Sequence, residues 1–131
     1  MTVFVDTSAF LVLLDAGDDD HGRVSSAFRS LRERGDQLLT HTYAVLETSA
    51  VAQRRLPTTA QRAFFQDLLA VVDVAPVDAS LYAVGVAALL ASPNSPSLVD
   101  QVSFALMRER GIGAAFALDA DFAKAGFTVL P

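Results

Sequence analysis

The sequence predicts a three-layer α/β/α protein, in which helices cover both faces of a mostly parallel sheet. Short apolar runs rich in β-forming residues alternate along the chain with longer segments of helical spacing, which is typical of parallel sheets. Apolar residues make up 52% of the 131 positions and charged residues 19%, as in chains that bury a core. We therefore expect residues 1–131 to form a single domain.

The first third of the chain predicts a buried strand that turns directly into a helix. An apolar, β-forming run at 3–5 ends on Asp6, and an apolar helical segment follows at once. Gly35 is placed to end the second helix, because glycine is favoured just past a helix C-terminus. The expected elements are a strand at 2–5, helices at 7–14 and 22–34 joined by a polar connection, and a short strand at 37–40.

The rest of the chain continues the alternation of helices and short strands. Pro76 interrupts the expected strand at 72–77, and because proline is confined to edge strands, this strand should lie at a sheet edge. Serines, prolines and an asparagine at 92–96 indicate a loop. The remaining elements are helices at 43–54, from 58 or 59 to 71, and at 78–91, 97–110 and 119–125, with strands at 114–118 and 127–130.

The composition excludes several classes of protein and site. The chain has no cysteine, which excludes disulfides and thiolate metal ligands. No apolar run approaches the roughly eighteen residues of a membrane span, so we expect a cytoplasmic protein without membrane contact. The net charge of −5 disfavours nucleic-acid binding unless a cation sits among the acids. Without Asp6, Glu47, Asp100 and Asp119 the chain has eleven acids and ten bases, so the rest of the protein is nearly neutral.

Four carboxylates stand where a parallel sheet would bring them to one edge. Asp6 and Asp119 end strands, and both are also suited to cap the helices that follow. Asp100 begins a helix after Ser97 in a capping-box pattern, which is a structural alternative for this acid. Glu47 lies in a helix that is apolar on most sides, so it faces either solvent or a polar cavity.

Taken together, the four acids predict a metal site. In a doubly wound sheet with the first and fourth strands adjacent, they meet in one crevice at the C-terminal ends of the strands. Crowded carboxylates repel and raise one another's pKa, and a divalent cation removes the conflict. Ligation by oxygen alone, without Cys or a His pair, favours Mg²⁺ or Mn²⁺. We expect Asp6, Asp100 and Asp119 to ligate the ion, and Glu47 to ligate it or to orient a water.

Three further polar residues lie near the expected site or its strands. Ser103 lies one helical turn after Asp100 on the same face, where its hydroxyl could bond a water or a phosphate. Asp121 is either a fifth ligand or a solvated acid in the first turn of a helix. His41 follows the second strand and is expected to be a core or edge histidine.

Four motifs stand in order over nearly the whole chain. They are Val-Asp-Thr-Ser-Ala-Phe at 5–10, the glutamate of Tyr-Ala-Val-Leu-Glu-Thr at 43–48, Ser-Leu-Val-Asp at 97–100 and Leu-Asp-Ala-Asp-Phe at 118–122. Together they resemble the PIN domain, and in particular the small bacterial VapC-type toxins of toxin–antitoxin pairs. Each motif alone is weakly specific, whereas four in sequence at such spacing are fairly specific.

The resemblance implies a single PIN domain over 1–131 with a five-stranded sheet in the order 3-2-1-4-5. It implies a Mg²⁺- or Mn²⁺-dependent endoribonuclease, the toxin of a type II toxin–antitoxin system, which forms a homodimer and is inhibited by a cognate antitoxin. Carried over by position, the family's acidic quartet falls on Asp6, Glu47, Asp100 and Asp119. The polar residue after the first acid falls on Thr7 or Ser8, Ser103 matches a frequently polar position, and Asp121 falls where the family varies.

Arginines on two of the expected helices could bind the substrate, and two other functions are compatible with parts of the sequence. Four arginines on the helices of Glu47 and Asp100 are candidates for contacts with RNA phosphates, namely Arg54, Arg55, Arg108 and Arg110. A non-catalytic PIN-like binding or scaffold module is the main alternative, but its signature would be a lost core acid. A phosphatase of the haloacid dehalogenase type would need an aspartate where Ser8 stands and a catalytic lysine, and the chain has only Lys124.

Overall fold

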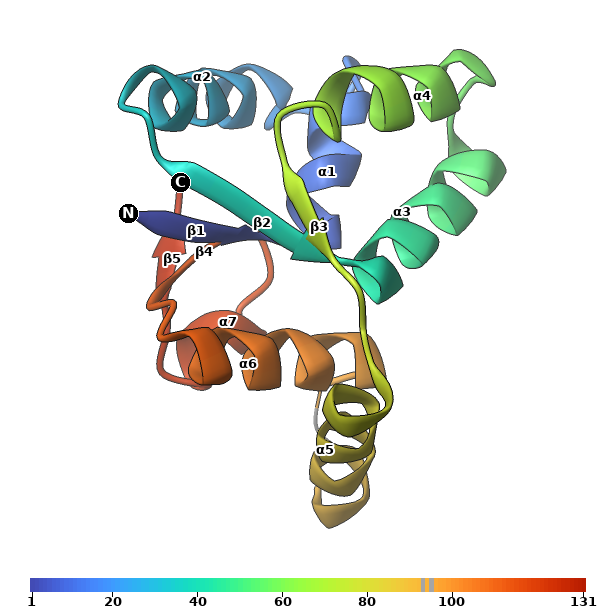
Figure 1. Cartoon of the computed structure of the whole chain (residues 1–131). Helices are drawn as coiled ribbons and strands as arrows, with labels where there is room; N and C mark the ends of the chain where they lie inside the picture. Colours follow the sequence, from blue (N-terminus) through green and yellow to red (C-terminus); the bar gives the residue numbers. More distant parts are fainter. Residues whose placement is uncertain (93, 95) are drawn as a thin grey trace.

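The computed structural model describes residues 1–92, 94 and 96–131, so Pro93 and Ser95 of the predicted 92–96 loop lie outside the described residues. Its elements in chain order are β1 (Thr2–Val5), α1 (Thr7–Leu14), α2 (His21–Glu33), β2 (Gln37–His41), α3 (Thr42–Arg55), α4 (Thr59–Arg62), η1 (Ala63–Leu68), β3 (Asp73–Ala75), α5 (Ala79–Ala91), α6 (Leu98–Arg110), β4 (Ala114–Phe116), α7 (Asp121–Lys124) and β5 (Thr128–Leu130), as Figure 1 shows.

The strands of the described chain form one sheet in the order β3-β2-β1-β4-β5, in which every neighbouring pair is parallel. In the centre, Phe4 of β1 lies opposite Leu39 of β2 on one side and Ala115 of β4 on the other. Pro76 follows β3 directly, and β3 lies at an edge. These features confirm the predicted strand order and edge strand. Because all the strands run the same way, their C-terminal ends meet along one edge of the sheet.

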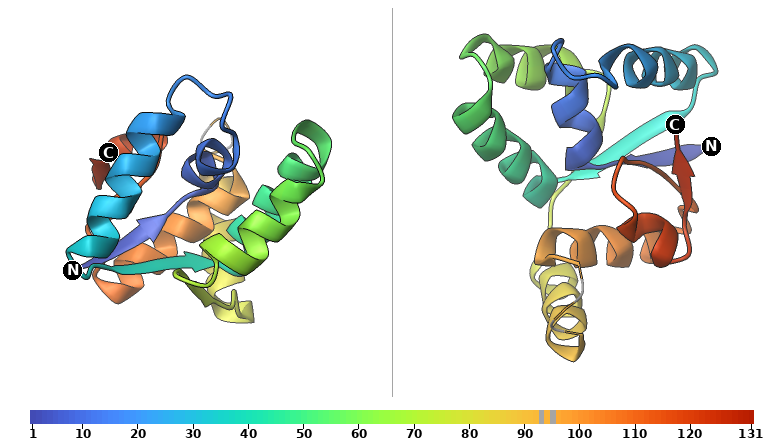
Figure 2. Two further views of the ribbon diagram at one scale, coloured as in Figure 1. Left: turned by 90° about the horizontal axis from the view of Figure 1, so that it is seen from above. Right: turned by 180° about the vertical axis from the view of Figure 1, so that it is seen from behind.

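Two apolar cores lie on opposite faces of this sheet, which confirms the three-layer prediction (Figures 1 and 2). Strand β1 supplies both cores, because alternate side chains of a strand point to opposite faces. Val3 and Val5 pack with α1, α2 and η1, whereas Phe4 packs with α6 and α7. On the first side Phe10 and Phe64 meet edge to face with ring centroids 5.1 Å apart.

The helix predicted from 58 or 59 to 71 is wrong in its second half. After α4 the chain forms the π-helix η1, and the N–H of Leu69 donates to the carbonyl of Phe64, five residues earlier. This wider coil leaves Phe64 fully buried, and the adjacent Leu68 and Leu69 both pack against the same core. A π turn shifts the helical register locally, and sequence periodicity alone does not reveal it.

Helix α5 stands away from the sheet and packs along α6 (Figure 1). Gly85 permits the contact, because a Cβ at this position would lie 2.6 Å from Cγ2 of Val102. Large apolar side chains of α5 remain outside, with Tyr82, Val84 and Leu90 exposed by 47%, 53% and 73%. Within the described residues, no helix combines the length and apolarity needed to cross a membrane.

Candidate metal centre

Two adjacent strands bring Asp6 and Asp119 to the same edge of the sheet. The N–H of Asp6 donates to the carbonyl of Phe116 at 3.0 Å, which continues the pairing of β1 with β4. Ser8 then links the two strand ends. Its hydroxyl donates to Oδ2 of Asp6 at 2.6 Å and accepts the N–H of Leu118 at 2.9 Å, one residue before Asp119. The first turn of α1 therefore holds both acids in place.

Asp100 reaches the same place from the start of α6. Ser97 caps this helix, and its hydroxyl oxygen accepts the N–H of Asp100 at 3.2 Å, as the capping-box pattern predicts. Asp6 also acts as a cap, because its Oδ2 accepts the N–H of Ser8 at 3.1 Å. Asp6 thus has its expected role as a cap, and this role does not compete with one at the site.

One carboxylate oxygen from each of Asp6, Asp100 and Asp119 lies within 4.8 Å of the other two. Two oxygens bound to one cation at about 2.1–2.4 Å can lie at most about 4.2–4.8 Å apart, so this spacing is compatible with a shared ion. The donors are all carboxylates, which suit a hard divalent cation. These residues therefore fit the metal that the sequence predicts.

Electrostatics at the cluster also favour a cation. Burial raises the pKa of Asp6 to about 6, opposed by the hydrogen bonds from Ser8, and Asp119 adds to the increase. The pKa of Asp100 is raised to about 7, first by burial and then by repulsion from the surrounding acids Asp6, Asp119, Asp121 and Glu47. Among the described residues, no Arg, Lys or His nitrogen lies within 4.0 Å of these carboxylates. The site therefore has an unbalanced negative charge.

Glu47 and Asp121 lie at the rim of the cluster. Glu47 is half-buried on α3 and contributes to the raised pKa of Asp100, but in the described chain it falls outside the 4.8 Å group. Asp121 is half-buried in the first turn of α7, and its N–H donates to Oδ1 of Asp119 at 2.9 Å. This bond forms a local turn at 119–121, so α7 begins two residues later than predicted. Both side chains are close enough to raise the pKa of Asp100 without belonging to the 4.8 Å group.

Thr7 and Ser103, two of the predicted accessory residues, are buried. The hydroxyl of Thr7 donates to the carbonyl of Ala44 at 3.2 Å. Ser103 is 0% exposed and lies 2.8 Å from Nε2 of His41, so the expectation that it meets a water or phosphate is wrong. His41, expected only as a core or edge histidine, is fully buried at the end of β2, and burial lowers its pKa to about 4.

The candidate arginines lie at different distances from the acids. Arg54 and Arg55 are exposed in the last turn of α3, and Arg54 lies two turns after Glu47 on the same helical face. Arg108 and Arg110 end α6, and ten residues of helix place Arg110 about 15 Å along the axis from Asp100. The guanidinium of Arg108 lies over the ring of Phe127, 5.4 Å from its centroid.

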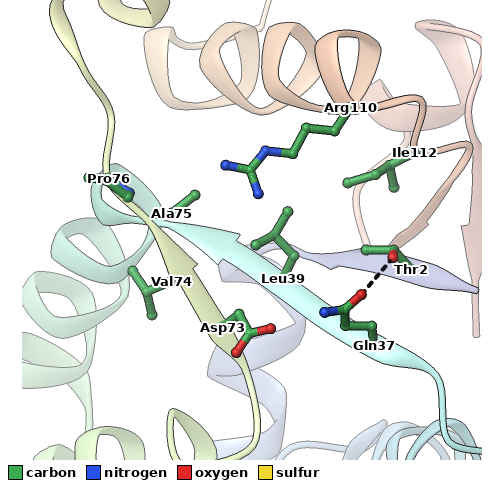
Figure 3. A pocket seen from close by; sticks show the side chains of 9 residues that line it. All are labelled: Thr2, Gln37, Leu39, Asp73, Val74, Ala75, Pro76, Arg110 and Ile112. Atoms are coloured by element: carbon green, nitrogen blue, oxygen red, sulfur yellow. Dashed lines mark hydrogen bonds between the residues drawn. The ribbon is translucent and has the colours of Figure 1, made fainter.

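Arg110 lines a cavity of about 410 Å³ beside the edge strand β3 (Figure 3). Thr2, Gln37 and Asp73 also line it, and each of them is the first residue of its strand. Ala75 and Pro76 line it as well, so the cavity runs along the edge strand β3, whereas the acids follow the central strands β1 and β4. Arg108 lies elsewhere, in a hollow that Asp121 also lines. Arg110 is therefore distant from the acids along α6, Arg108 is near the rim at Asp121, and Arg54 and Arg55 lie on the helix of Glu47.

A parallel sheet with carboxylates assembled at its C-terminal edge is the arrangement expected of a metal-dependent PIN-type nuclease. The sequence profile of the PIN domain matches residues 3–128, and the chain belongs to the PIN-domain family. It is 36% identical over 127 residues, 95% of each chain, to the 23S rRNA-specific endonuclease VapC20 of Mycobacterium tuberculosis strains CDC 1551 / Oshkosh and H37Rv.

Solved structures agree with this assignment. The crystal structure of Mycobacterium tuberculosis VapC20, a Sarcin-Ricin loop cleaving toxin, matches with a TM-score of 0.85 and 34% identity over 96% of each chain. VapBC2 from Rickettsia felis, bound to a DNA fragment from their promoter, shares the fold with a TM-score of 0.73 at 8% identity, covering 99% of this chain and 98% of that one. FitAcB from Neisseria gonorrhoeae matches with a TM-score of 0.70 at 18% identity, covering 100% and 97%. The predictions of a VapC-type toxin and of an endoribonuclease are thereby confirmed.

Proposed function

We propose that the protein hydrolyses RNA at the cluster of Asp6, Asp100 and Asp119 with Mg²⁺ or Mn²⁺ bound there, and that its substrate is 23S rRNA. The observation that carries the metal site is the convergence of the three carboxylates within 4.8 Å without a protein cation beside them in the described chain. The substrate is inferred from VapC20, the 23S rRNA-specific endonuclease that matches 95% of this chain.

The residues of the chain divide the work of phosphodiester hydrolysis. Asp6, Asp100 and Asp119 would hold the ion, and both raised carboxyls must lose their protons first. A bound divalent ion lowers the pKa of an attacking water and stabilises charge on the reacting phosphate. Glu47, at the rim, would accept a hydrogen bond from that water and orient it for in-line attack. Arg54 and Arg55 extend the same helix outward, where RNA phosphates would pass.

The test combines metal binding with RNA cleavage. Calorimetric titration of Mg²⁺ and Mn²⁺ should show binding to the parent protein and its loss in Asp100→Asn. Purified ribosomes should yield a discrete 23S rRNA fragment only with the parent and metal, and a chelator should abolish it. Cleavage that survives the chelator would contradict the metal role, and cleavage of another RNA but not 23S rRNA would contradict the substrate. A non-catalytic module is not favoured, because the sequence retains an acid at each of the four positions of the family's quartet.

We further propose a homodimer and a cognate antitoxin in the cytoplasm, where ribosomal RNA is found. Helix α5 carries no charged residue from Ala79 to Ala91, and its exposed apolar side chains suit a second copy of the chain. Leu46 beside Glu47 is 70% exposed and offers an apolar anchor for an antitoxin segment near the site. Light scattering of the parent and of Val84→Glu should show a dimer and a monomer. Co-expression with the product of a neighbouring gene should give a stable complex without RNase activity.

A further inference from the structure

We propose that His41, acting through Ser103, is a positioning residue that fixes the helices carrying Asp100 and Glu47 relative to each other at the metal centre. This inference rests on the proposed function, because it concerns the same metal site. It assigns a role to a buried imidazole that does not itself face the acids. The argument depends on a chain of hydrogen bonds that joins the helices carrying these two acids.

The imidazole of His41 bonds to both helices at once. Its Nδ1 accepts the N–H of Ala44 at 3.1 Å, which makes His41 the N-cap of α3. Since a neutral imidazole carries one N–H, the proton is then on Nε2, which donates to the hydroxyl of Ser103 at 2.8 Å. The ring is 0% exposed, so water cannot replace either bond without opening the core. The tautomer and the orientation of the ring are both determined by these partners.

Ser103 transmits the contact to the start of α6. Its hydroxyl oxygen accepts from His41, so its own proton is free to donate to the carbonyl of Val99 at 2.9 Å. Val99 is the residue directly before Asp100. The first turn of α6 is therefore tied to the end of β2, 62 positions earlier in the sequence, at the point where Asp100 enters the metal centre.

A second branch of the same network reaches the other acids. The carbonyl of Ala44 accepts the hydroxyls of Thr7 at 3.2 Å and of Thr48 at 2.7 Å. Thr7 follows Asp6 directly and Thr48 follows Glu47 directly. The backbone of Ala44 thus accepts hydrogen bonds from α1 and α3 at its carbonyl oxygen and donates one from its N–H to His41. Each branch of the network ends one residue from a carboxylate of the site.

The burial of this network explains why it would affect metal affinity. Thr7, His41, Thr48 and Ser103 are exposed by 5% or less. Buried polar groups that lose a partner cannot bond to water, so the surrounding helices must shift or accept an unsatisfied group. Partners outside the ligand shell typically change metal affinity by about 10–100-fold when they are removed. Because the ion requires three oxygens at once, a small shift of α6 would be enough.

The experiment separates positioning from general stability with matched variants. Ser103→Ala removes the link to α6. His41→Asn keeps an oxygen near the position of Nδ1 to cap α3 but is too short to reach Ser103. His41→Gln places an amide nitrogen near the position of Nε2 and should restore the link. Thr40→Val is the control, because Thr40 is also fully buried and its Oγ1 has no partner in the described chain.

The measurements are Mn²⁺ affinity by calorimetry, Tm without metal, and kcat and KM for RNA cleavage. We expect Ser103→Ala and His41→Asn to bind Mn²⁺ about tenfold more weakly and to lose kcat with little change in KM. His41→Gln should recover affinity to within about threefold, and Thr40→Val should equal the parent. Variants that lose Tm but keep the parent's Mn²⁺ affinity overturn the inference and leave the metal site standing. A parent that binds no metal overturns the proposed function itself and this inference with it.

Discussion

At the N-terminal end of the sheet, Asp36 lies between the guanidinium of Arg34, 2.6 Å away, and the terminal amino group, 3.4 Å away. At the C-terminal end, Asp100 faces Asp6 and Asp119 instead. Bonding to Arg34 holds the pKa of Asp36 below its usual value, whereas burial and like charges raise the pKa of Asp100 to about 7. The first carboxylate is balanced by cationic groups of the protein, whereas the second is surrounded by other acids.

This difference supports the proposal that Asp36 serves stability and that Asp100 serves the metal site. An arginine placed beside Asp100, as Arg34 stands beside Asp36, would remove the repulsion and also occupy the position of a metal. The chain instead holds the acidic cluster with hydroxyls, as Ser8 holds Asp6. Perturbed carboxylates without a cationic partner concentrate at functional sites, because there the unfavourable charge is relieved only by the ligand.

The largest expected effect is the loss of metal binding and RNA cleavage when the charge of Asp6 is removed. Asp6→Asn retains an oxygen to cap α1 and should preserve the fold, but it removes a charged ligand. We expect Mn²⁺ affinity to fall by at least about 100-fold and RNA cleavage to become undetectable. Calorimetry and a cleavage assay under the same buffer conditions measure both effects.

Asp36→Asn is the matched control at the other end. It should bind Mn²⁺ and cleave RNA as the parent does, while its Tm falls, because the Arg34 and N-terminal charges lose their partner. Equal loss of metal affinity in the two variants would contradict the division between a structural and a functional acid.

Protonation should weaken metal binding at the C-terminal end. With pKa values of about 6 for Asp6 and about 7 for Asp100, both carboxyls gain protons as the pH falls through this range. Bound protons compete with the ion, so Mn²⁺ affinity at pH 5.5 should be about 30–100-fold lower than at pH 7.5. Titrations at several pH values in buffers that do not chelate metal measure the slope. A pH-independent affinity over this range would show that the acids are already ionised and would contradict the raised pKa values.

In the absence of metal, the same repulsion should reduce stability. The pKa of Asp100 is raised from 3.8 to about 7 on folding, so the folded protein binds the proton more tightly than the unfolded chain. The stability of the metal-free parent should therefore fall as the pH rises from about 4 to about 7 and then level off. Since Asp100 is only partly buried, we expect Asp100→Asn to unfold at pH 8 with about 1–2 kcal/mol more free energy than the parent.

Urea denaturation with chelator present measures this difference. The Asp36→Asn variant should deviate from the parent in the opposite direction, because its carboxylate is stabilised in the folded state. If Asp100→Asn proved less stable than the parent at pH 8 without metal, the repulsion inferred from the cluster would be wrong.

The sequence predicted the sheet and the acids because both depend on local pattern. Alternating apolar strands and helices predict parallel strands, whose C-terminal ends share one edge. The order that sets β1 beside β4, and so brings their acids together, was implied by the resemblance to the PIN domain. Ser103 was misplaced for a different reason. It does share a helical face with Asp100, but whether that face meets solvent or His41 depends on a partner 62 positions away. Local spacing contains no information about such a contact.

The arginines show the same limit over a longer distance. Arg110 is close to Asp100 in sequence, yet α6 carries it about 15 Å away along the helix axis. Arg54 is far from Asp6 in sequence, yet it shares a helix face with Glu47. A position relative to the site requires the direction of each helix across the sheet, which only the assembled fold provides.

The smallest expected effect distinguishes the two groups of arginines. Arg54→Ala removes a charge on the face of Glu47 and should raise the KM for RNA about threefold while kcat stays unchanged. The slope of log KM against log salt concentration should fall by about one, the value for a single lost phosphate contact. Arg110→Ala removes a charge of the same sign beside the edge strand β3 (Figure 3) and should leave kcat and KM as in the parent. Cleavage kinetics at several salt concentrations measure both variants. Equal effects of the two variants would mean that bound RNA also contacts Arg110. They would contradict the prediction that RNA binds only near the face of Glu47.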